Sequence, residues 1–260
     1  MKMLKKSLLL ALCAVMVVLC AACASTPASS AKKTFIVGLD DSFPPMGFRD
    51  DDNNIVGLDV DLATEVAKRM GMEVELKPID WDAKALELSS GNIDCLWNGV
   101  TITEERKKEM DFSRPYLANQ QVVIVLADSQ ITDIPSLAGS TVGLQKGSSA
   151  LDALNKNEIA SQVTVNEYAD NVTALTDLTI GRVDAVLLDE VVARYYETKE
   201  AGTYRVLDDA FAAEEYGIGF KPGNKELLDK VQKVFDEMCA DGTAAKISEK
   251  WFGKDIIVKP

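Results

Sequence analysis

The side chains available for chemistry in this chain are carboxylates, arginines and hydroxyls, because its 260 residues include no histidine. Histidine is the commonest general base and metal ligand, and it completes the usual serine and cysteine nucleophile pairs. The sequence also lacks a GxGxxG motif, a P-loop and paired CxxC motifs. These observations argue against most hydrolases and lead us to expect no cofactor and no metal site.

Four groups of polar residues each follow a short apolar run of the kind that forms a β-strand. They are Asp40–Phe43 after residues 35–39, Asn98–Thr101 and then Arg106 after residues 93–97, Gln145–Ser149 after residues 141–144, and Asp189 with Glu190 after residues 185–188. Ligands bind at the carboxyl ends of strands in open parallel sheets. We therefore expect these four groups to form the site.

The elements that must position these groups alternate between strand and helix. Residues 59–70 have apolar side chains at helical spacing, with Asp59 as the expected N-cap and Gly71 as the expected stop. The elements that follow are a strand over 73–78, a helix near 82–89 and a strand from Ile93. This order predicts parallel strands joined by helical crossovers.

Two short motifs occur twice and in the same order. Val37-Gly-Leu39 returns as Val142-Gly-Leu144, and Gly91-Asn-Ile-Asp94 returns as Gly181-Arg-Val-Asp184. Two lobes of similar build are the simplest account. The alternative is a chance repeat, because glycine is favoured after any helix.

The predicted lobes are joined by two extended segments, residues 116–125 and 216–220, which we interpret as crossover strands. Two final helices are expected to return to the first lobe, at 225–241 and 243–251. The first lobe then comprises residues 34–119 and 217–260, and the second comprises residues 120–216.

The N-terminus has the order of a secretory signal. Three lysines precede an uncharged apolar run from Leu8 to Ala22. The run is about fifteen residues long, which is shorter than the roughly 20 that a spanning helix needs. Residues 1–22 are therefore predicted to be a cleaved signal peptide.

The segment Leu19-Cys-Ala-Ala-Cys23 resembles a bacterial lipobox, in which the final cysteine becomes lipidated. Cys20 departs from the pattern, since leucine is usual there. An ordinary signal peptide with incidental cysteines is the alternative. We expect a lipidated Cys23 at the start of a flexible tether over residues 23–33.

Cleavage after residue 22 would leave 25 basic and 41 acidic residues, a formal net charge of −16. Such acidity argues against nucleic acid as a partner. Cys95 and Cys239 are the two cysteines beyond Cys23. Export permits a disulfide, but two distant cysteines are more often simply buried, so no bridge is predicted.

With these segments in view, the chain resembles the polar amino-acid-binding proteins of ABC importers, solute-binding protein family 3, from Phe35 to about Phe252. The block from Thr101 to Tyr116 carries the resemblance most strongly. The other carriers are Gly57-Leu-Asp-Val-Asp-Leu62, Asn98-Gly-Val-Thr101, Gly181-Arg-Val-Asp184 and the terminal Asp241-Gly-Thr243 with Lys250-Trp-Phe252.

The resemblance implies a two-lobed α/β fold of the periplasmic-binding-protein type II, with a mixed five-stranded sheet in each lobe and the two crossover strands as hinge. It implies a lipid-anchored, extracytoplasmic protein without enzymatic activity. The protein would capture a polar L-amino acid by closing its cleft, and would deliver it to an ABC transporter permease. We expect it to act as a monomer.

The implied residue roles agree with the chemistry of a zwitterion. Arg106 offers a planar fork for the ligand carboxylate, completed by the backbone N–H groups of Thr101, Ser148 and Ser149. Asp189 would accept from the ligand ammonium, together with the Gly99 carbonyl and the Thr101 hydroxyl. Arg106 could instead be a solvated arginine, and Asp189 could pair with a nearby arginine.

The side-chain pocket is implied to include Phe43, Trp81, Asp40 and Asn98. Arginine, lysine, glutamine or cystine all remain open as ligands, whereas glutamate would meet the carboxylate of Asp40 or Asp41. Trp97 stays unassigned. Asp59 and its neighbour Asp61 are interpreted as helix caps.

Two other function classes are alternatives to a binding protein. A cyclohexadienyl-type dehydratase on the same fold would need a positioned acid, for which Glu190 and Asp41 are available. A ligand-sensing module would normally continue into a spanning helix, whereas this sequence ends at Pro260 soon after the last expected helix. Neither class is favoured by the motifs.

Overall fold

The computed structural model describes residues 33–260, which form one compact unit. The predicted signal peptide, Cys23 and the tether up to residue 32 lie outside the described residues. No helix within residues 33–260 is both long enough and apolar enough to cross a membrane.

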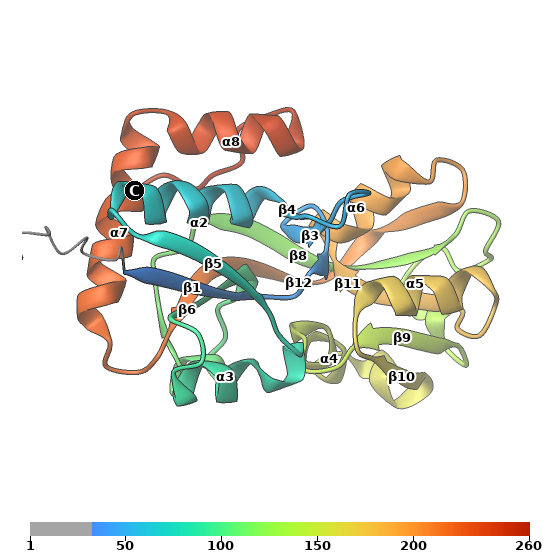
Figure 1. Ribbon diagram of the computed structural model, residues 1–260. Coiled ribbons are helices and arrows are strands. Elements are labelled where there is room, and N and C mark those ends of the chain that lie inside the picture. The colour runs from blue at the N-terminus through green and yellow to red at the C-terminus, as the bar shows by residue number, and fades with distance from the viewer. Residues whose placement is uncertain (1–32) are drawn as a thin grey trace, which may run out of the picture. The chain divides into compact units, whose positions relative to one another are not determined.

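The centre of this unit is a mixed sheet of nine strands (Figure 1). Eight strands are hydrogen-bonded in the order β10-β9-β11-β8-β12-β6-β1-β5, and β7 pairs with β12 outside this path. The strands are β1 (Thr34–Leu39), β5 (Glu73–Pro78), β6 (Cys95–Thr101), β7 (Asp111–Phe112), β8 (Leu117–Leu126), β9 (Thr141–Gln145), β10 (Thr164–Tyr168), β11 (Ala185–Asp189) and β12 (Tyr204–Phe220). A small second sheet joins β2 (Ser42–Phe43), β3 (Gly47–Arg49) and β4 (Ile55–Val56).

The helices alternate with these strands as the sequence predicts. They are α2 (Leu58–Arg69), α3 (Lys84–Ser90), α4 (Ser149–Asn155), α5 (Asn171–Thr179), α6 (Glu190–Lys199), α7 (Lys225–Ala240) and α8 (Thr243–Phe252). Short 3-10 turns add η1 (Trp81–Ala83), η2 (Arg106–Lys108), η3 (Pro135–Leu137) and η4 (Glu158–Gln162). The α/β fold class is therefore confirmed.

The two long strands β8 and β12 join the two halves of the sheet. β12 pairs with β8 from Tyr204 to Tyr216 and with β6 from Tyr216 to Phe220, antiparallel in both cases. The first half of the sheet (β5, β1, β6 and β7) and the second half (β10, β9 and β11) are therefore parts of one hydrogen-bonded sheet. The sequence predicted only the last five residues of β12, because the stretch before Tyr216 is rich in charge and reads poorly as a strand.

The repeated motifs have the same structural role in each half. Gly91 and Gly181 both have positive φ and end a helix. Three residues later, Asp94 accepts from the backbone N–H of Ile36 at 2.8 Å, and Asp184 accepts from that of Thr141 at 2.7 Å. Each aspartate thereby joins the start of one parallel strand to the next, which supports the interpretation as an internal repeat.

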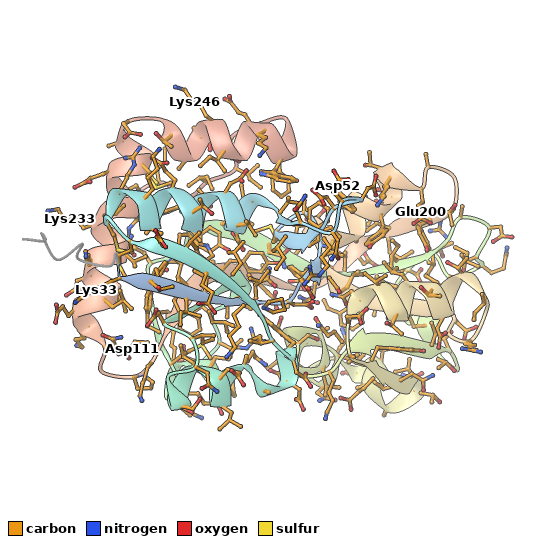
Figure 2. The ribbon with its side chains drawn as sticks, viewed as in Figure 1. Lys33, Asp52, Asp111, Glu200, Lys233 and Lys246 are labelled. Atoms are coloured by element: carbon orange, nitrogen blue, oxygen red, sulfur yellow. The ribbon has the colours of Figure 1, made fainter. Side chains whose placement is uncertain are left out.

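The two faces of the sheet have different cores, because successive side chains of a strand point to opposite faces. On one face, which we call the continuous face, a single apolar cluster includes residues of α2, α5, α6 and α7 from both halves of the sheet. On the other, the divided face, one cluster lies under α4 and a second under α3. Figure 1 shows α2 and α8 above the sheet, with α3 and α4 below it. Charged side chains such as those of Lys233 and Lys246 point outward (Figure 2).

Helix α2 corrects two sequence predictions. It begins after Gly57, which provides no side-chain cap, so Asp59 and Asp61 lie inside the helix and neither caps it. The Asp59 carboxylate instead accepts from Tyr116 and Gly99, and Asp61 accepts from Trp251 Nε1 at 2.7 Å. The sequence could not distinguish these tertiary acceptors from caps, because acids are also common in the first turn of helices.

The C-terminus of α2 matches its prediction. Gly71 has φ of +72° and donates to the Lys68 carbonyl, and Met72 donates to the Ala67 carbonyl. This paired closure requires a left-handed residue, which glycine supplies without a steric cost.

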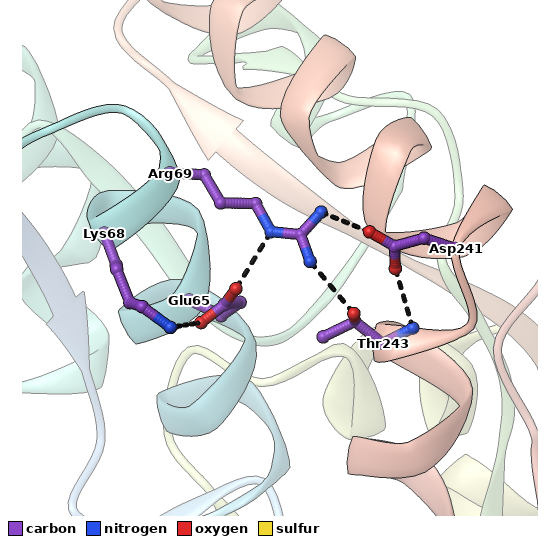
Figure 3. Close-up of polar contacts among 5 residues, drawn as sticks. All are labelled: Glu65, Lys68, Arg69, Asp241 and Thr243. Atoms are coloured by element: carbon purple, nitrogen blue, oxygen red, sulfur yellow. Dashed lines mark hydrogen bonds and ion pairs between the residues drawn. The ribbon is translucent and has the colours of Figure 1, made fainter.

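Arg69 ties the end of α2 to the junction of α7 and α8 (Figure 3). Its guanidinium donates to Glu65 at 2.9 Å, to Asp241 at 2.7 Å and to the Thr243 hydroxyl at 2.9 Å. The terminal Asp241-Gly-Thr243 motif is therefore used to dock the final helices on the first half of the sheet.

One strand boundary differs from the prediction in a way that affects the site. β6 runs from Cys95 to Thr101, so Asn98–Thr101 lie within the strand and not after it. All seven residues of the strand are buried. The sequence suggested an earlier end because Asn98 and Gly99 are both depleted in strands.

Candidate ligand-binding site

One cavity brings together residues at or just after the ends of five strands, β1, β5, β6, β9 and β11. It is lined by Phe43, Trp81, Gly99, Thr101, Arg106, Gln145, Ser148, Ser149 and Asp189. Eight of these nine are assigned to the site by the sequence, and Gln145 lies in a predicted strand-end group without an assigned role. Asp40 and Asn98 are assigned by the sequence but do not line the cavity.

Arg106 is a buried guanidinium that makes no ion pair within the described part of the chain. Its Nη1 donates to the Thr101 carbonyl at 3.0 Å and its Nη2 to the Gly147 carbonyl at 3.2 Å. The arginine ion pairs within residues 33–260 involve other arginines. Burial lowers the pKa of Arg106, yet a guanidinium stays charged in proteins. A carboxylate from outside the chain would supply the missing charge.

Asp189 is a buried carboxyl group at the end of β11. It accepts from Asn119 Nδ2 at 2.8 Å and from the Tyr216 hydroxyl at 2.5 Å, and it makes no ion pair within the described residues. Burial and the nearby charge of Glu214 raise the pKa of Asp189 to about 7. An ammonium group would stabilise the charged form and lower this pKa.

The hydroxyls of the site are already linked to each other. Thr101 Oγ1 lies 3.1 Å from Ser149 Oγ and donates to Glu214 at 3.0 Å. Ser148 occupies the N-cap position of α4, but its hydroxyl and its N–H both donate hydrogen bonds to the Gln145 carbonyl. The predicted use of the Ser148 N–H for an anion would therefore require that turn to rearrange.

Asp40 and Asn98 form a layer beside the cavity. The backbone N–H of Asp40 donates to Asn98 Oδ1 at 3.1 Å, and Asp40 accepts from Gln145 Nε2 at 2.7 Å. Gln145 also donates to the Ala169 carbonyl at 3.1 Å. Burial raises the pKa of Asp40 to about 6. Gln145 thus stands at the cavity wall with Asp40 as its partner, a relation that depends on two segments 105 residues apart.

Two aromatic residues of the cavity also belong to the apolar core, Phe43 to the cluster of the continuous face and Trp81 to the cluster under α3. Phe43 and Trp81 line the cavity. Trp97, left unassigned by the sequence, is fully buried and packs edge-on against Tyr116 and Phe235. Trp97 therefore belongs to the core.

Asp59 is a residue near the site that sequence reasoning misassigned. Its carboxylate accepts from the Gly99 N–H at 2.8 Å and from the Tyr116 hydroxyl. Gly99 has φ of +56°, and a Cβ there would lie 2.8 Å from the Phe43 ring. Asp59 thus accepts a hydrogen bond from Gly99, the one glycine among the residues that line the cavity. The available signal was an acid on the apolar stripe of α2, three residues before Leu62 and seven before Val66.

The cavity is bordered by polar contacts between the two halves of the sheet. Lys84 Nζ donates to the Gly147 carbonyl at 2.7 Å, and Lys146 pairs with Asp82 at 2.8 Å. Burial lowers the pKa of Lys84 to about 8. These contacts connect η1 and α3 with the turn before α4.

The acids considered for a dehydratase lie away from this cavity. Asp41 pairs with Arg49 at 2.6 Å, and Glu190 accepts from Gln120 and pairs with Arg194. Neither lines the cavity. Within residues 33–260, no group of three or more cysteine, aspartate or glutamate side chains could hold a metal ion. Cys95 and Cys239 are both free thiols.

Comparison with known proteins agrees with this geometry. The model of the bacterial extracellular solute-binding proteins, family 3, matches residues 35–254. An L-cystine-binding protein of Escherichia coli strain K12 is 38% identical over 225 residues, which cover 86% of this chain and 84% of the relative.

Two solved structures share both fold and sequence with the chain. An ABC uptake transporter substrate-binding protein from Streptococcus pneumoniae with bound histidine is 37% identical, has a TM-score of 0.84, and is matched over 87% of this chain and 95% of its own. An ancestral arginine-binding protein bound to arginine is 41% identical, has a TM-score of 0.80, and is matched over 86% of this chain and 100% of its own.

Proposed function

Because the chain belongs to the bacterial extracellular solute-binding proteins of family 3, we propose that the cavity around Arg106 and Asp189 binds the backbone of a polar L-amino acid. The protein is an amino-acid-binding protein of an ABC importer, as its relatives are. It releases its ligand to the permease of that importer, and it does so as a monomer without chemical turnover.

The observation that carries this proposal is the pair of unpaired, buried, opposite charges in one cavity. Arg106 and Asp189 both line the cavity, and neither makes an ion pair with another side chain of residues 33–260. A buried charge without a partner is costly. A zwitterion compensates both charges at once, with its carboxylate on the Arg106 fork and its ammonium on Asp189.

The ligand side chain is one that donates hydrogen bonds. Gln145 donates its two Nε2 hydrogens to Asp40 and to the Ala169 carbonyl. Only its side-chain oxygen Oε1 is therefore left for a ligand. Asp40 adds a buried carboxylate behind it. Basic and amide side chains, such as those of arginine and glutamine, match these acceptors, whereas a glutamate side chain would face only acceptors.

Ligand binding closes the protein around the hinge strands β8 and β12. The lobes that move are residues 34–119 with 217–260 on one side and residues 120–216 on the other. Arg106 and Asp189 come from different lobes, so one ligand contacts both and favours the closed state.

A thermal-shift screen of a chain that begins at Ala24 tests the binding class. A ligand at one hundred times its dissociation constant adds roughly 2.7 kcal/mol of stability. We expect a shift with one or a few of arginine, lysine, histidine, glutamine and cystine, and none with glutamate. If no amino acid raises the melting temperature of the wild type, the proposed function is wrong.

The N-terminal segment delivers and anchors the protein outside the cytoplasm. Residues 1–22 act as the signal peptide, and Cys23 carries the lipid at the start of the tether over 23–33. Metabolic labelling with a fatty acid should mark the wild type and not Cys23→Ser. Equal labelling of both would contradict the anchor.

A further inference from the structure

We propose that Glu214 is a positioning residue that makes the site selective for an α-ammonium group, by fixing the direction of the hydroxyl hydrogen bonds beside it. The inference rests on the proposed function, because it concerns the same cavity. Glu214 lies on the hinge strand β12 and does not itself line the cavity around Arg106.

One carboxylate oxygen of Glu214 accepts three hydrogen bonds from side chains that are 93 to 113 residues away from it in the sequence. Oε2 accepts from Thr101 Oγ1 at 3.0 Å, from Gln121 Nε2 at 3.0 Å and from Asn119 Nδ2 at 3.3 Å. Thr101, Gln121 and Asn119 are all buried. Asn119 also donates to Asp189, so Glu214 and the anionic residue of the cavity share one amide.

The direction of these hydrogen bonds follows from the number of protons available. A hydroxyl has one hydrogen, and Thr101 gives its hydrogen to Glu214. The contact of 3.1 Å between Thr101 and Ser149 must therefore have Ser149 as the donor. Gln121 Nε2 in turn donates to Ser149 Oγ at 3.3 Å. The hydrogen bonds thus run in one direction, from Gln121 to Ser149, from Ser149 to Thr101 and from Thr101 to Glu214.

Two amide oxygens show that the carboxylates set this direction. Gln121 Oε1 and Asn119 Oδ1 are buried and have no hydrogen-bond partner within the described residues. Each amide leaves its oxygen unpaired while its nitrogen faces a carboxylate. A buried unpaired acceptor is unfavourable, so attraction to Glu214 and Asp189 must outweigh it.

This direction decides what the cavity can recognise. Since both hydroxyl hydrogens are committed, Thr101 and Ser149 cannot donate to a ligand. Thr101 already accepts from Ser149, so one lone pair of its hydroxyl is left for the ligand. That lone pair, together with Asp189, suits a donor such as an ammonium group. An α-hydroxy acid brings one hydrogen in place of three and no positive charge.

The test compares an amino acid with its 2-hydroxy analogue in titration calorimetry. The pairs are L-arginine with its 2-hydroxy acid and L-histidine with imidazole-lactate, on the wild type, Glu214→Gln and the control Glu215→Gln on the same strand. A glutamine at position 214 can donate from Nε2 to Thr101 Oγ1, which frees the Thr101 hydrogen to point to the ligand. We expect the amino-acid to hydroxy-acid affinity ratio to fall about tenfold or more in Glu214→Gln, and to stay unchanged in the control.

A Thr101→Val background separates positioning from folding. Without the hydroxyl there is nothing to orient, so Glu214→Gln should change the ratio much less in that background. An unchanged ratio in the single variant, or an equal effect in both backgrounds, overturns the inference while the proposed function stands. If the wild type binds a different amino acid, that amino acid and its 2-hydroxy analogue replace these pairs. If the wild type binds no amino acid, the proposed function fails and the inference fails with it.

Discussion

The continuous face and the divided face of the sheet are built from alternate residues of the same strands, yet their side chains pack into different apolar clusters. On β8, Val122 and Ile124 enter the single cluster of the continuous face, whereas Val123 and Val125 enter only the cluster under α4. On β6, Trp97 belongs to the continuous face and Val100 to the cluster under α3. Both halves of the sheet thus share one core on one side and have separate cores on the other.

The polar site lies among elements whose apolar packing is interrupted. Thr101, Arg106 and Ser149 come from elements flanking the two clusters of the divided face. Apolar contact excludes water without directional preference, whereas buried charges need specific partners. Phe43 is the one cavity-lining residue that also belongs to the cluster of the continuous face. Apart from it, the difference between the faces separates stability from recognition, and substitutions on each should affect mainly one of the two.

The largest effect is expected from Arg106→Ala. Truncating a buried, hydrogen-bonded charge that faces a ligand charge costs about 2–5 kcal/mol of binding free energy, so amino-acid affinity measured by calorimetry should fall at least roughly thirtyfold. Arg182→Ala, which removes an exposed arginine paired with Asp177, is the control. Equal loss of affinity in both variants would show that the cavity is not the site.

Leu62→Ala should have the opposite profile, with lost stability and retained binding. Leu62 is fully buried in the cluster of the continuous face, and such truncations cost about 2–5 kcal/mol of unfolding free energy. Denaturant unfolding measures the loss. Leu86→Ala, at a leucine that is 67% exposed, should change little. A large drop in ligand affinity for folded Leu62→Ala would break the separation between the faces.

A smaller effect is expected from pH. Burial raises the pKa of Asp59 and of Asp189 to about 7 and that of Asp40 to about 6. The folded protein therefore holds protons that the unfolded chain has released between about pH 4 and pH 7, so the unfolding free energy falls as pH rises through this range. Melting temperatures from pH 4.5 to 8 should show this slope, and Asp59→Asn should flatten it. Asp52→Asn, on an exposed turn, is the control, and an equal slope in Asp59→Asn and wild type would contradict the assignment.

The smallest effect is expected from Arg69→Met. The contacts of Arg69 with Glu65 and Asp241 lie near the surface, where ion pairs contribute little. The melting temperature should fall by only about 1–3 °C, and the difference should shrink in high salt because exposed charges are screened. Lys68→Met, whose contact in Figure 3 is with Glu65 alone, is the control. A larger loss would mean that docking of α7 and α8 depends on this contact.

Local pattern was enough to predict most elements, because periodicity and end signals are encoded within a few residues. The helical stripe and Gly71 located α2 to within one residue at each end, and the strand at 73–78 was predicted at its observed bounds. Eight cavity residues followed from their positions near strand ends and from the family resemblance. The roles of Asp59 and Asp61 did not follow, since an acid in a first helical turn looks the same whether it caps the helix or binds Tyr116 or Trp251.

By itself, the sequence determined the strands and helices that lead to the site, the recurrence of two motifs in the same order, and the presence of an arginine and an aspartate able to bind a zwitterion. Only the tertiary structure decided that Gln145 donates a hydrogen bond to Asp40. It also decided that Glu214 accepts hydrogen bonds from Thr101, 113 residues away, and from Asn119, 95 residues away. The physical reason is that periodicity reports burial over neighbouring residues, whereas a hydrogen bond needs a donor and an acceptor within about 3 Å. Which distant atoms come that close is set by the pairing of β8 with β12 and of β12 with β6.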